Sequence, residues 1–355
     1  MELLKKIFDD KFAKAAFIIL AVLYAIILFA NFIAPYSNYY SNRDLSYAPP
    51  STIYTIDENG KFSKPYTYNY VRKYDKNLMQ TVFKQDRTKK YYIKFFPKAE
   101  KYKILGIIPT HRHLFGTEKG GEIHLLGTDI NGRDVFSRLL FGGRISMTVG
   151  FLSLLIVFPI GLLYGGISGY FGGKIDIILM RFAEAIMAIP SFYLLIILAA
   201  ILPSGMTSTQ RFALIVVILA LIGWAGFARV VRGMVLSIKN EDFVLASKTM
   251  GASNLRIILK HIIPQTTSYV IVAMTLSVPS YILAESGLSF LGLGIQQPDA
   301  SWGNMLKEAQ EYTNLLYRPW LLAPGGLIFI AVLCFNLLGD AVRDILDPKS
   351  QSREN

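Results

Sequence analysis

Four charged residues of both signs are concentrated in one short stretch, at Asp129, Arg133, Asp134 and Arg138. The guanidinium of Arg carries a planar fork of donors that matches the two oxygens of a carboxylate. These side chains can therefore neutralise one another in a network that fixes a loop, or they can bind a charged partner outside the chain. Both interpretations are open at the level of the sequence.

The chain lacks the loop that binds the phosphates of ATP. That loop has the pattern G-x-x-x-x-G-K-[ST], in which backbone amides surround the phosphates and the hydroxyl binds magnesium. Gly60-Lys61 and Gly173-Lys174 have neither the spacing nor the hydroxyl. We therefore expect no catalytic residues and no ATP hydrolysis by this chain, and any such hydrolysis must come from separate subunits.

Metal and thiol chemistry have little support in the sequence. His111 and His113 are close together, but no carboxylate or cysteine accompanies them at the spacing of metal ligands, so we interpret them as a surface pair. The single cysteine, Cys334, lies in an apolar run, which predicts a small core residue and excludes a disulfide framework. We expect neither a metal site nor a cofactor.

The composition is that of a membrane protein. The chain has 355 residues, of which 52% are hydrophobic and 17% are charged. A helix needs roughly 20 apolar residues to cross the hydrocarbon core of a bilayer, and several uncharged runs reach that length. The net charge of +12 is spread over tails and loops, so it flanks a membrane and does not form a surface for nucleic acid.

Six apolar runs predict six transmembrane helices in an all-α polytopic bundle. The first run is too long for the hydrophobic region of a signal peptide and follows several lysines, so we expect it to be retained. Pro and Gly interrupt several runs, which transmembrane helices tolerate when neighbouring helices pack closely against them. The runs start at Ala15, Ile145, Ala183, Phe212, Thr266 and Trp320.

Four ionisable residues lie near these predicted spans. Arg181 and Glu184 are three positions apart on one helix face, and Glu285 and Asp340 are at predicted span ends. Charge is costly to bury in a membrane and can mark a transport pathway. Local pairing or anchoring at the interface is the alternative for each.

The charge of the loops and tails predicts the orientation. With a cytoplasmic amino terminus, six crossings place the carboxyl terminus in the cytoplasm, together with the basic residues Arg229, Arg232 and Lys239, as the positive-inside rule requires. Residues 36–124 also carry excess positive charge, but they form too long a segment for that rule to apply. The predicted parts are 1–35 (cytoplasmic tail and first span), 36–124 (extracytoplasmic insertion), 125–348 (five-helix core) and 349–355 (cytoplasmic tail).

The segment 36–124 has the pattern of a small β-rich insertion. It is rich in Tyr and Phe, and stretches such as TIYTI and YYIKFF alternate in polarity or favour strands. Asn59-Gly60 separates two of these stretches, and both residues tolerate the positive φ of a tight hairpin turn. We predict a folded extracytoplasmic domain with a hairpin at this dipeptide.

The connection between the fourth and fifth apolar runs is basic, amphipathic and longer than a turn requires. On a helix that starts at Asp242, the side chains of Phe243, Ala246 and Met250 share one face. Gly251 then supplies the positive φ at which helices commonly end. The first part of the connection is therefore predicted to be a short helix with a sharp stop.

A second short helix is predicted to follow, from an N-cap at Ser253 to a point near Pro264. The whole segment, 241–264, would then be two short helices joined by a bend. An amphipathic helix lying on lipid is the alternative. Small side chains such as Ser247 and Ala252 favour close docking on a protein instead.

This segment resembles the EAA loop of ATP-binding-cassette importer permeases, whose pattern is Glu-Ala-Ala, three residues, Gly and a distal Ile-x-Leu-Pro. Ala246, Gly251 and Pro264 match that pattern, whereas Leu245 replaces the Glu and Ser247 the second Ala. The resemblance implies that the segment docks on an ATPase subunit. The contact residues would be Glu241, Asp242, Phe243, Ala246, Ser247, Met250, Gly251, Ala252, Ser253 and Pro264.

A longer match supports the same family. The stretch HLLGTDINGRDVFSRLLFGGRISMTVG from His124 resembles the signature before the second span of the C-type permease subunit in oligopeptide and dipeptide importers, and GLSFLGLG, SWGNML and LGDAVRDILDP resemble later parts of that subunit. The resemblance covers about 124–348 and the first span. The matching signature residues are Gly127, Thr128, Asp129, Gly132, Arg133, Asp134, Ser137 and Arg138.

The resemblance implies a permease subunit in the bacterial cytoplasmic (inner) membrane. Its partners would be a second homologous permease subunit, two cytoplasmic ATP-binding subunits, an extracytoplasmic substrate-binding protein and membrane lipid, with no nucleic acid. Movement of 241–264 with the ATPases would alternate the access of a path between the two permeases. The implied substrates are oligopeptides or dipeptides, with nickel or oligosaccharides as alternatives within the family.

Two other classes of protein stay open. An ion-gradient-driven carrier needs no ATPase and predicts internal repeats, with carboxylates or broken helices near the middle of the bilayer. The sequence has no obvious repeat, and its carboxylates lie near span ends. A membrane assembly protein would use 36–124 as its working part and the spans as anchors.

Overall fold

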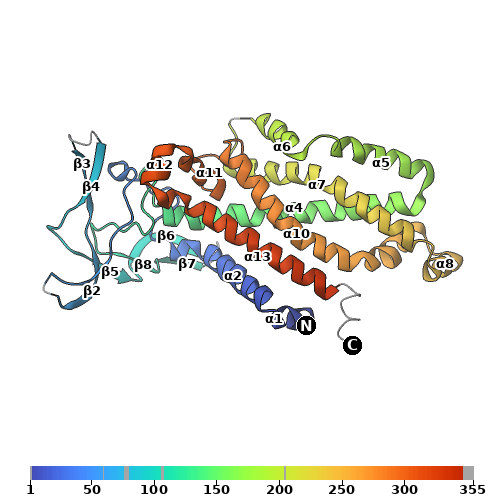
Figure 1. Cartoon of the computed structure of the whole chain (residues 1–355), viewed down its shortest axis with the longest axis horizontal. Coiled ribbons are helices and arrows are strands. Elements are labelled where there is room, and N and C mark those ends of the chain that lie inside the picture. The colour runs from blue at the N-terminus through green and yellow to red at the C-terminus, as the bar shows by residue number, and fades with distance from the viewer. Residues whose placement is uncertain (1, 59, 76–79, 105–107, 204, 347–355) are drawn as a thin grey trace. The chain divides into compact units, whose positions relative to one another are not determined.

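A computed structural model describes residues 2–58, 60–75, 80–104, 108–203 and 205–346 (Figure 1). The chain divides into two compact units. The helical unit comprises Met1–Leu20, Met147–Leu288 and Phe329–Asn355. The mixed unit, which contains the strands, comprises Ala21–Ser146 and Ser289–Ile328.

Within the residues that the structure describes, five helical stretches are long and apolar enough to cross a membrane. A bent pair of shorter helices, α5 (Gly173–Met187) and α6 (Ser191–Ala200), makes a sixth span if the two are counted together. This agrees with a polytopic membrane protein of five or six spans. The five stretches are Lys11–Leu28 (α2), Val135–Phe171 (α4), Ser208–Ile238 (α7), Asn254–Phe290 (ending in α10, Thr267–Phe290) and Pro319–Leu346 (ending in α13, Ala323–Leu346).

The third predicted span is not the single helix that the apolar run from Ala183 suggests. Helix α5 ends at Met187, and the chain bends by 76° before α6 begins. Pro190 occupies the N-cap position of α6 with a ψ of 122°, outside the helical region. A proline also disfavours helical geometry in the residue before it, so the helix ends just upstream. In contrast, Pro159 and Pro279 lie inside α4 and α10.

Small residues bring α4 and α7 close together in the helical unit. A Cβ added at Gly165 would overlap the backbone of α7 near Ala228, and one at Gly169 would lie 2.8 Å from the carbonyl oxygen of Arg232. Glycines let membrane helices approach at backbone contact, where dispersion attraction is largest. The two helices therefore form a tightly packed pair (Figure 1).

An ion pair joins α5 to α7 beside this contact. Arg232 donates to both carboxylate oxygens of Asp176, at 2.6 and 2.5 Å, and the hydroxyl of Ser168 donates to the same carboxylate at 2.5 Å. Asp176 is buried. From the sequence, Arg232 was predicted only as a flanking charge, because nothing local links it to a residue more than fifty positions upstream.

Replacing Arg232 with Met is expected to lower the free energy of unfolding by about 2 kcal/mol, because Asp176 would stay buried without its cation. The midpoint of thermal unfolding of the purified protein in detergent measures the effect. Arg229→Met is the matched control, since Arg229 is exposed on the same helix. Equal midpoints for the two variants would show that the ion pair contributes nothing to stability.

The connection after α7 differs from the predicted pair of short helices. Helix α8 (Asp242–Thr249) is present, but the helix that begins at Asn254 does not end near Pro264; it continues to Phe290. A π-helical turn precedes the proline, and the proline lies in the first turn of a 3-10 segment, where its missing amide is tolerated. The pieces are α9 (Asn254–Ile257), η2 (Ile258–Ile262) and η3 (Ile263–Thr266).

The strands of the mixed unit form a four-stranded antiparallel sheet in the order β1-β2-β5-β8 and two hairpins, β3-β4 and β6-β7. Tyr54 pairs with Tyr66, and Tyr66 pairs with Tyr92, so a row of tyrosines crosses the sheet. The strands are β1 (Tyr54–Ile56), β2 (Phe62–Thr67), β3 (Tyr70–Asp75), β4 (Gln80–Gln85), β5 (Tyr91–Phe95), β6 (Lys98–Ile104), β7 (Ile108–Arg112) and β8 (Phe115–Thr117).

The predicted hairpin between the first two strands is present. Strand β1 pairs with β2, and Gly60 has a φ of +73° in the connection; Asn59, the other residue of the predicted turn, lies outside the described residues. The interpretation of His111 and His113 as a surface pair is wrong for His113, which is buried and stacks on Tyr102 at 4.9 Å between ring centres. No cluster of three or more potential metal ligands occurs in the part of the chain that the structure describes.

The remaining elements are short helices. Helix α1 belongs to the helical unit, and the others belong to the mixed unit. They are α1 (Glu2–Asp9), α3 (Ala30–Ile33), η1 (Arg43–Leu45), α11 (Trp302–Leu306), η4 (Lys307–Gln310), α12 (Tyr312–Tyr317) and η5 (Pro319–Leu322).

Candidate functional site

The signature stretch folds as a loop against the segment that follows the first span. The hydroxyl of Thr128 donates to the carbonyl oxygen of Leu45 at 2.5 Å and accepts the amide of Ala48 at 2.8 Å. Gly127 and Gly132 have φ values of +67° and +69°, and backbone atoms of the opposing segment contact both. The two glycines are therefore required for both their φ and their lack of a side chain.

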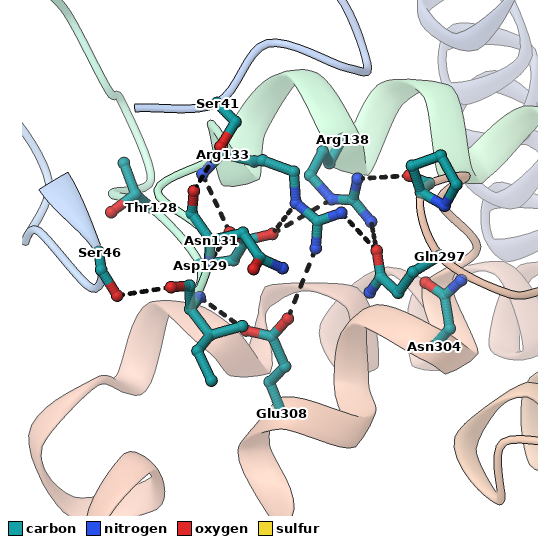
Figure 2. Close-up of polar contacts among 12 residues, drawn as sticks. Ser41, Ser46, Thr128, Asp129, Asn131, Arg133, Arg138, Gln297, Asn304 and Glu308 are labelled. Atoms are coloured by element: carbon teal, nitrogen blue, oxygen red, sulfur yellow. Dashed lines mark hydrogen bonds and ion pairs between the residues drawn. The ribbon is translucent and has the colours of Figure 1, made fainter. Parts of the chain in front are cut away.

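Arg133 holds the centre of a polar network (Figure 2). Its Nε donates to Asp129 Oδ2 at 2.6 Å, one Nη donates to Gln297 Oε1, and the other lies 3.9 Å from Glu308 Oε1. Asp129 also accepts the backbone amide of Arg133 at 2.9 Å. The residues of this network come from distant parts of the chain.

Arg138, on the first turn of α4, completes the network. It donates to the carbonyl oxygen of Pro298 at 2.9 Å and to Gln297 Oε1 at 3.2 Å, and its Nε lies 3.5 Å from Asp129 (Figure 2). All four signature charges are at most 5% exposed. Asp129, Arg133 and Arg138 neutralise one another, in line with one of the two interpretations, whereas Asp134 pairs with a histidine outside the four. All four present little surface for a partner to contact.

Asp134 immediately precedes α4 and binds a histidine that had no predicted role. Its Oδ2 accepts the amide of Ser137 at 2.7 Å, and its Oδ1 lies 3.0 Å from Nδ1 of His124. Glu122 lies 3.6 Å from the other ring nitrogen. Burial opposes the charged imidazole, but the two carboxylates outweigh it and raise the pKa of His124 to about 9.

Glu308 is the acidic residue that the network holds least well. Burial and the nearby charge of Asp129 raise its pKa to about 7, against the opposing effects of the Ile130 amide, 3.1 Å away, and of Arg133 and Arg138. Neither Glu308 nor Gln297 carries a local signal. Gln297 lies between the GLSFLGLG and SWGNML stretches, and Glu308 follows SWGNML; these stretches are the only signal for this region in the sequence.

The predicted ATPase-coupling residues are split between two faces of α8. Phe243, Ala246 and Met250 are exposed together, as the helix face predicted, and Met250 is 79% exposed. Ser247, which was grouped with them, is buried, and its hydroxyl donates to the carbonyl oxygen of Phe243 at 2.9 Å. Its position one residue after Ala246 rotates it by about 100° around the helix, which places it on the inner face.

The inner face of α8 is anchored to the helical unit. Val244 belongs to a buried cluster with Val231 and Val235 of α7 and with Ile257 and Ile262 on the helix that follows. Because these side chains are closely packed, a displacement of α8 would also displace α7 and the long helix that contains α10.

The ends of this segment differ in how well they match the prediction. Gly251 has a φ of +81° and ends α8, as expected. Ser253 occupies the N-cap position of α9, but its side chain makes no capping bond. Ala252 packs partly against the buried cluster. Among the residues outside the predicted face, the exposed ones include Glu241, Asp242, Leu245, Gly251, Ser253 and Pro264.

The four candidate pathway charges are not brought together. Arg181 and Glu184 form an exposed ion pair at 3.2 Å, which is the local pairing considered above. Asp340 is exposed, whereas Glu285 is fully buried in α10. Cys334 is buried in α13, as expected of a small core residue.

Comparisons with known proteins identify the family. Residues 159–352 match the family described as "Binding-protein-dependent transport system inner membrane component", and residues 2–50 match the "N-terminal TM domain of oligopeptide transport permease C".

Individual relatives agree with these matches. The chain is 48% identical to the dipeptide transport system permease protein of Bacillus subtilis over 228 residues, which cover 64% of this chain and 69% of that protein. It is 43% identical to the oligopeptide transport system permease protein of the same organism (64% and 72% covered). The nickel transport system permease protein of Escherichia coli is 40% identical (63% and 79% covered). The chain therefore belongs to the binding-protein-dependent transport system inner membrane component family, and it is a multi-pass protein of the inner membrane.

Proposed function

We propose that this chain is a transmembrane permease subunit of an ATP-driven, binding-protein-dependent importer of oligopeptides or dipeptides. The observation that carries the proposal is the identity of 48% and 43% to permeases of dipeptide and oligopeptide transport systems. The chain would act with a second permease subunit, two cytoplasmic ATP-binding subunits and an extracytoplasmic binding protein. Because its sequence has no phosphate-binding loop, the ATP-binding subunits supply the hydrolysis.

In the proposed orientation both termini and 241–264 are cytoplasmic, and 36–124 is extracytoplasmic. The exposed apolar side chains of α8, Phe243, Ala246 and Met250, then face the cytoplasm and dock on an ATP-binding subunit. The buried contacts of Val244 transmit the movement of that subunit to α7 and to the helix that contains α10. Closure of the two ATP-binding subunits would in this way change which side of the membrane has access to the substrate path.

Uptake by the complete system in proteoliposomes tests this function. Vesicles are loaded with ATP, ionophores collapse all ion gradients, and uptake of a labelled tripeptide is followed with the binding protein present. We expect ATP-dependent uptake that survives the ionophores. Uptake that needs an ion gradient and not ATP would establish the gradient-driven carrier instead, and ATP-driven uptake of nickel without peptide would move the chain to the nickel branch of the family.

Charge on the exposed face of α8 is expected to uncouple the transporter. In the double variant Ala246→Glu, Met250→Glu, the carboxylates would be desolvated against the partner surface, so peptide uptake is expected to fall at least tenfold while the amount of folded chain stays unchanged. The control is Lys248→Gln with Thr249→Glu, two exposed changes elsewhere on the same helix. Equal uptake by both double variants would locate the coupling contact elsewhere.

A further inference from the structure

The mixed unit contains a cavity of about 730 Å³ beside the first turns of α4. Its wall includes the segment that follows the first span, one residue of β6, and the stretch just before α11. A volume of this size lies within the range of pockets that bind small organic ligands. Five aromatic side chains line it: Tyr36, Tyr39, Tyr40, Tyr102 and Phe141.

Stacking fixes much of this aromatic wall in place. Tyr36 lies between Tyr40 and His124, with ring centres 4.6 and 5.1 Å apart, and its hydroxyl oxygen accepts the amide of Ile123 at 2.8 Å. The hydroxyl of Tyr40 donates to Glu122 at 2.9 Å. A ligand in this cavity therefore meets rings that are already ordered, so little conformational entropy is lost when it binds.

One acidic side chain, Asp299, lines the same cavity. Its Oδ1 accepts the hydroxyl of Tyr39 at 2.8 Å and the amide of Asn38 at 3.4 Å, both of which are neutral donors. Within the described residues, no Lys, Arg or His nitrogen lies within 4.0 Å of this carboxylate. Its charge is held in position but is not neutralised by a direct ion pair with any of them.

Arg144, the arginine that lines the cavity, binds backbone carbonyl groups at the end of the first span. Arg144 donates to the carbonyl oxygens of Ile27 and Leu28 at 3.0 Å each, at the end of α2. Its charge thus satisfies a helix end. Asp299 interacts with the charge of Arg138 at longer range, but it forms no direct ion pair with any residue that the structure describes. A ligand that places a positive charge beside Asp299 would complete the site.

We propose that this cavity binds the free amino terminus of the transported peptide, with its ammonium group between the carboxylate of Asp299 and the tyrosine rings. An ammonium group is attracted by a carboxylate and by the faces of aromatic rings. A neutral amide would leave the carboxylate without a direct ion pair, and an anion would be repelled by it. The inference rests on the proposed function and adds a substrate contact within this chain.

In the proposed orientation the cavity is on the side from which substrate arrives. It lies between the end of the first span and the insertion 36–124, whose Tyr102 contributes to its wall. The insertion is then a part of the substrate path as well as an external domain. The cavity would therefore contact the peptide during transport, which a void with only a structural role would not do.

Equilibrium binding to the complete transporter in nanodiscs, without the binding protein, tests this site. The probes are tetra-alanine, its N-acetylated form, and N-acetyl-Ala-Ala-Ala-Lys, which carries its ammonium on a side chain. Native transporter is expected to bind tetra-alanine about tenfold more tightly than either acetylated peptide.

The variants Asp299→Asn and Asp299→Glu separate charge from folding. Asp299→Asn is expected to remove the tenfold preference and to leave the affinity for acetylated tetra-alanine unchanged, which shows that the cavity is intact. Asp299→Glu is expected to retain a preference, and Glu311→Gln, an exposed acid outside the cavity, to retain it in full.

Equal affinity of the native transporter for free and acetylated tetra-alanine would overturn the inference, as would a full preference in Asp299→Asn. Tight, Asp299-dependent binding of the lysine peptide would overturn the assignment to the amino terminus. If ATP-driven uptake of peptide persists in any of these cases, the proposed function stands without this site. If uptake is absent, the proposed function itself has failed.

Discussion

Gly132→Ala is expected to be among the most damaging single substitutions in the chain, with a loss of about 3 to 5 kcal/mol of folding free energy. Gly132 has a φ of +69°, and a Cβ there would overlap the carbonyl group of Asn42. Backbone cannot move aside as a flexible side chain can, so the loop and the segment after the first span would separate. The amount of folded protein and its midpoint of thermal unfolding in detergent measure the effect.

Gly120→Ala is the matched control for this substitution. Gly120 also has a positive φ, of +89°, but a Cβ there would meet only the ring of Tyr91, at an ordinary 3.7 Å. The cost should be that of the backbone conformation alone, about 1 to 2 kcal/mol. If the two variants unfold at the same temperature, the close backbone contact at Gly132 adds nothing to the cost of the substitution.

Arg133→Gln is the second substitution with a large expected effect, because it removes the cation between the buried carboxylate of Asp129 and the partly buried carboxylate of Glu308. Asp129 and Glu308 would then repel one another with only Arg138 left to compensate, and the expected loss is about 3 to 5 kcal/mol at pH 8. The midpoint of thermal unfolding, compared with that of the native chain at the same pH, measures this loss. The stability loss is expected to become smaller as the pH falls from 8 to 6.

The direction of this pH dependence follows from Glu308. Its pKa is about 7 in the folded chain, above the ordinary value of 4.5 for a glutamate, so the folded state binds the proton more tightly, and ionisation of Glu308 destabilises it as the pH rises between these values. Loss of Arg133 raises the pKa of Glu308 further. His124 has a pKa near 9 in the folded chain, so its protonation stabilises the native chain and the Arg133→Gln variant alike. Its contribution therefore cancels when the two are compared at the same pH.

The double variant Arg133→Gln, Glu308→Gln distinguishes charge repulsion from lost packing. It is expected to recover part of the stability and to lose the part of the pH dependence between pH 6 and 8 that Glu308 contributes, while the part that His124 contributes remains. A deficit that is independent of pH in the single variant, or no recovery in the double variant, would show that the network contributes through shape and not through charge.

The membrane spans could be predicted from the sequence because each needs only a local run of apolar residues. The end of α8 at Gly251 was equally local, since it depends on one residue with a positive φ. The exposed face of α8 followed from helical periodicity. Ser247 shows the limit of that reasoning, because a residue chosen for its size, and not for its position around the helix, proved to be buried.

The partners of the signature charges could not be predicted from the sequence. Gln297 and Glu308 lie more than 150 positions after Arg133, and only the folded chain brings them within reach. The same is true of Asp176 and Arg232, on two different helices. The bend before Pro190 could not be predicted for another reason. The apolar run continues unchanged across this position, whereas the helix ends there and a second helix starts in a different direction.

Affinity purification of the tagged chain, from solubilised membranes of cells that express the whole transport system, tests whether α8 docks on an ATP-binding subunit. Quantitative mass spectrometry then counts the subunits that accompany it. We expect one second permease and two ATP-binding subunits per native chain, and in Ala246→Glu, Met250→Glu the loss of ATP-binding subunits with the second permease retained. If no ATP-binding subunit accompanies the native chain, or if the variant retains both of them, α8 is not the contact between this permease and the ATP-binding subunits.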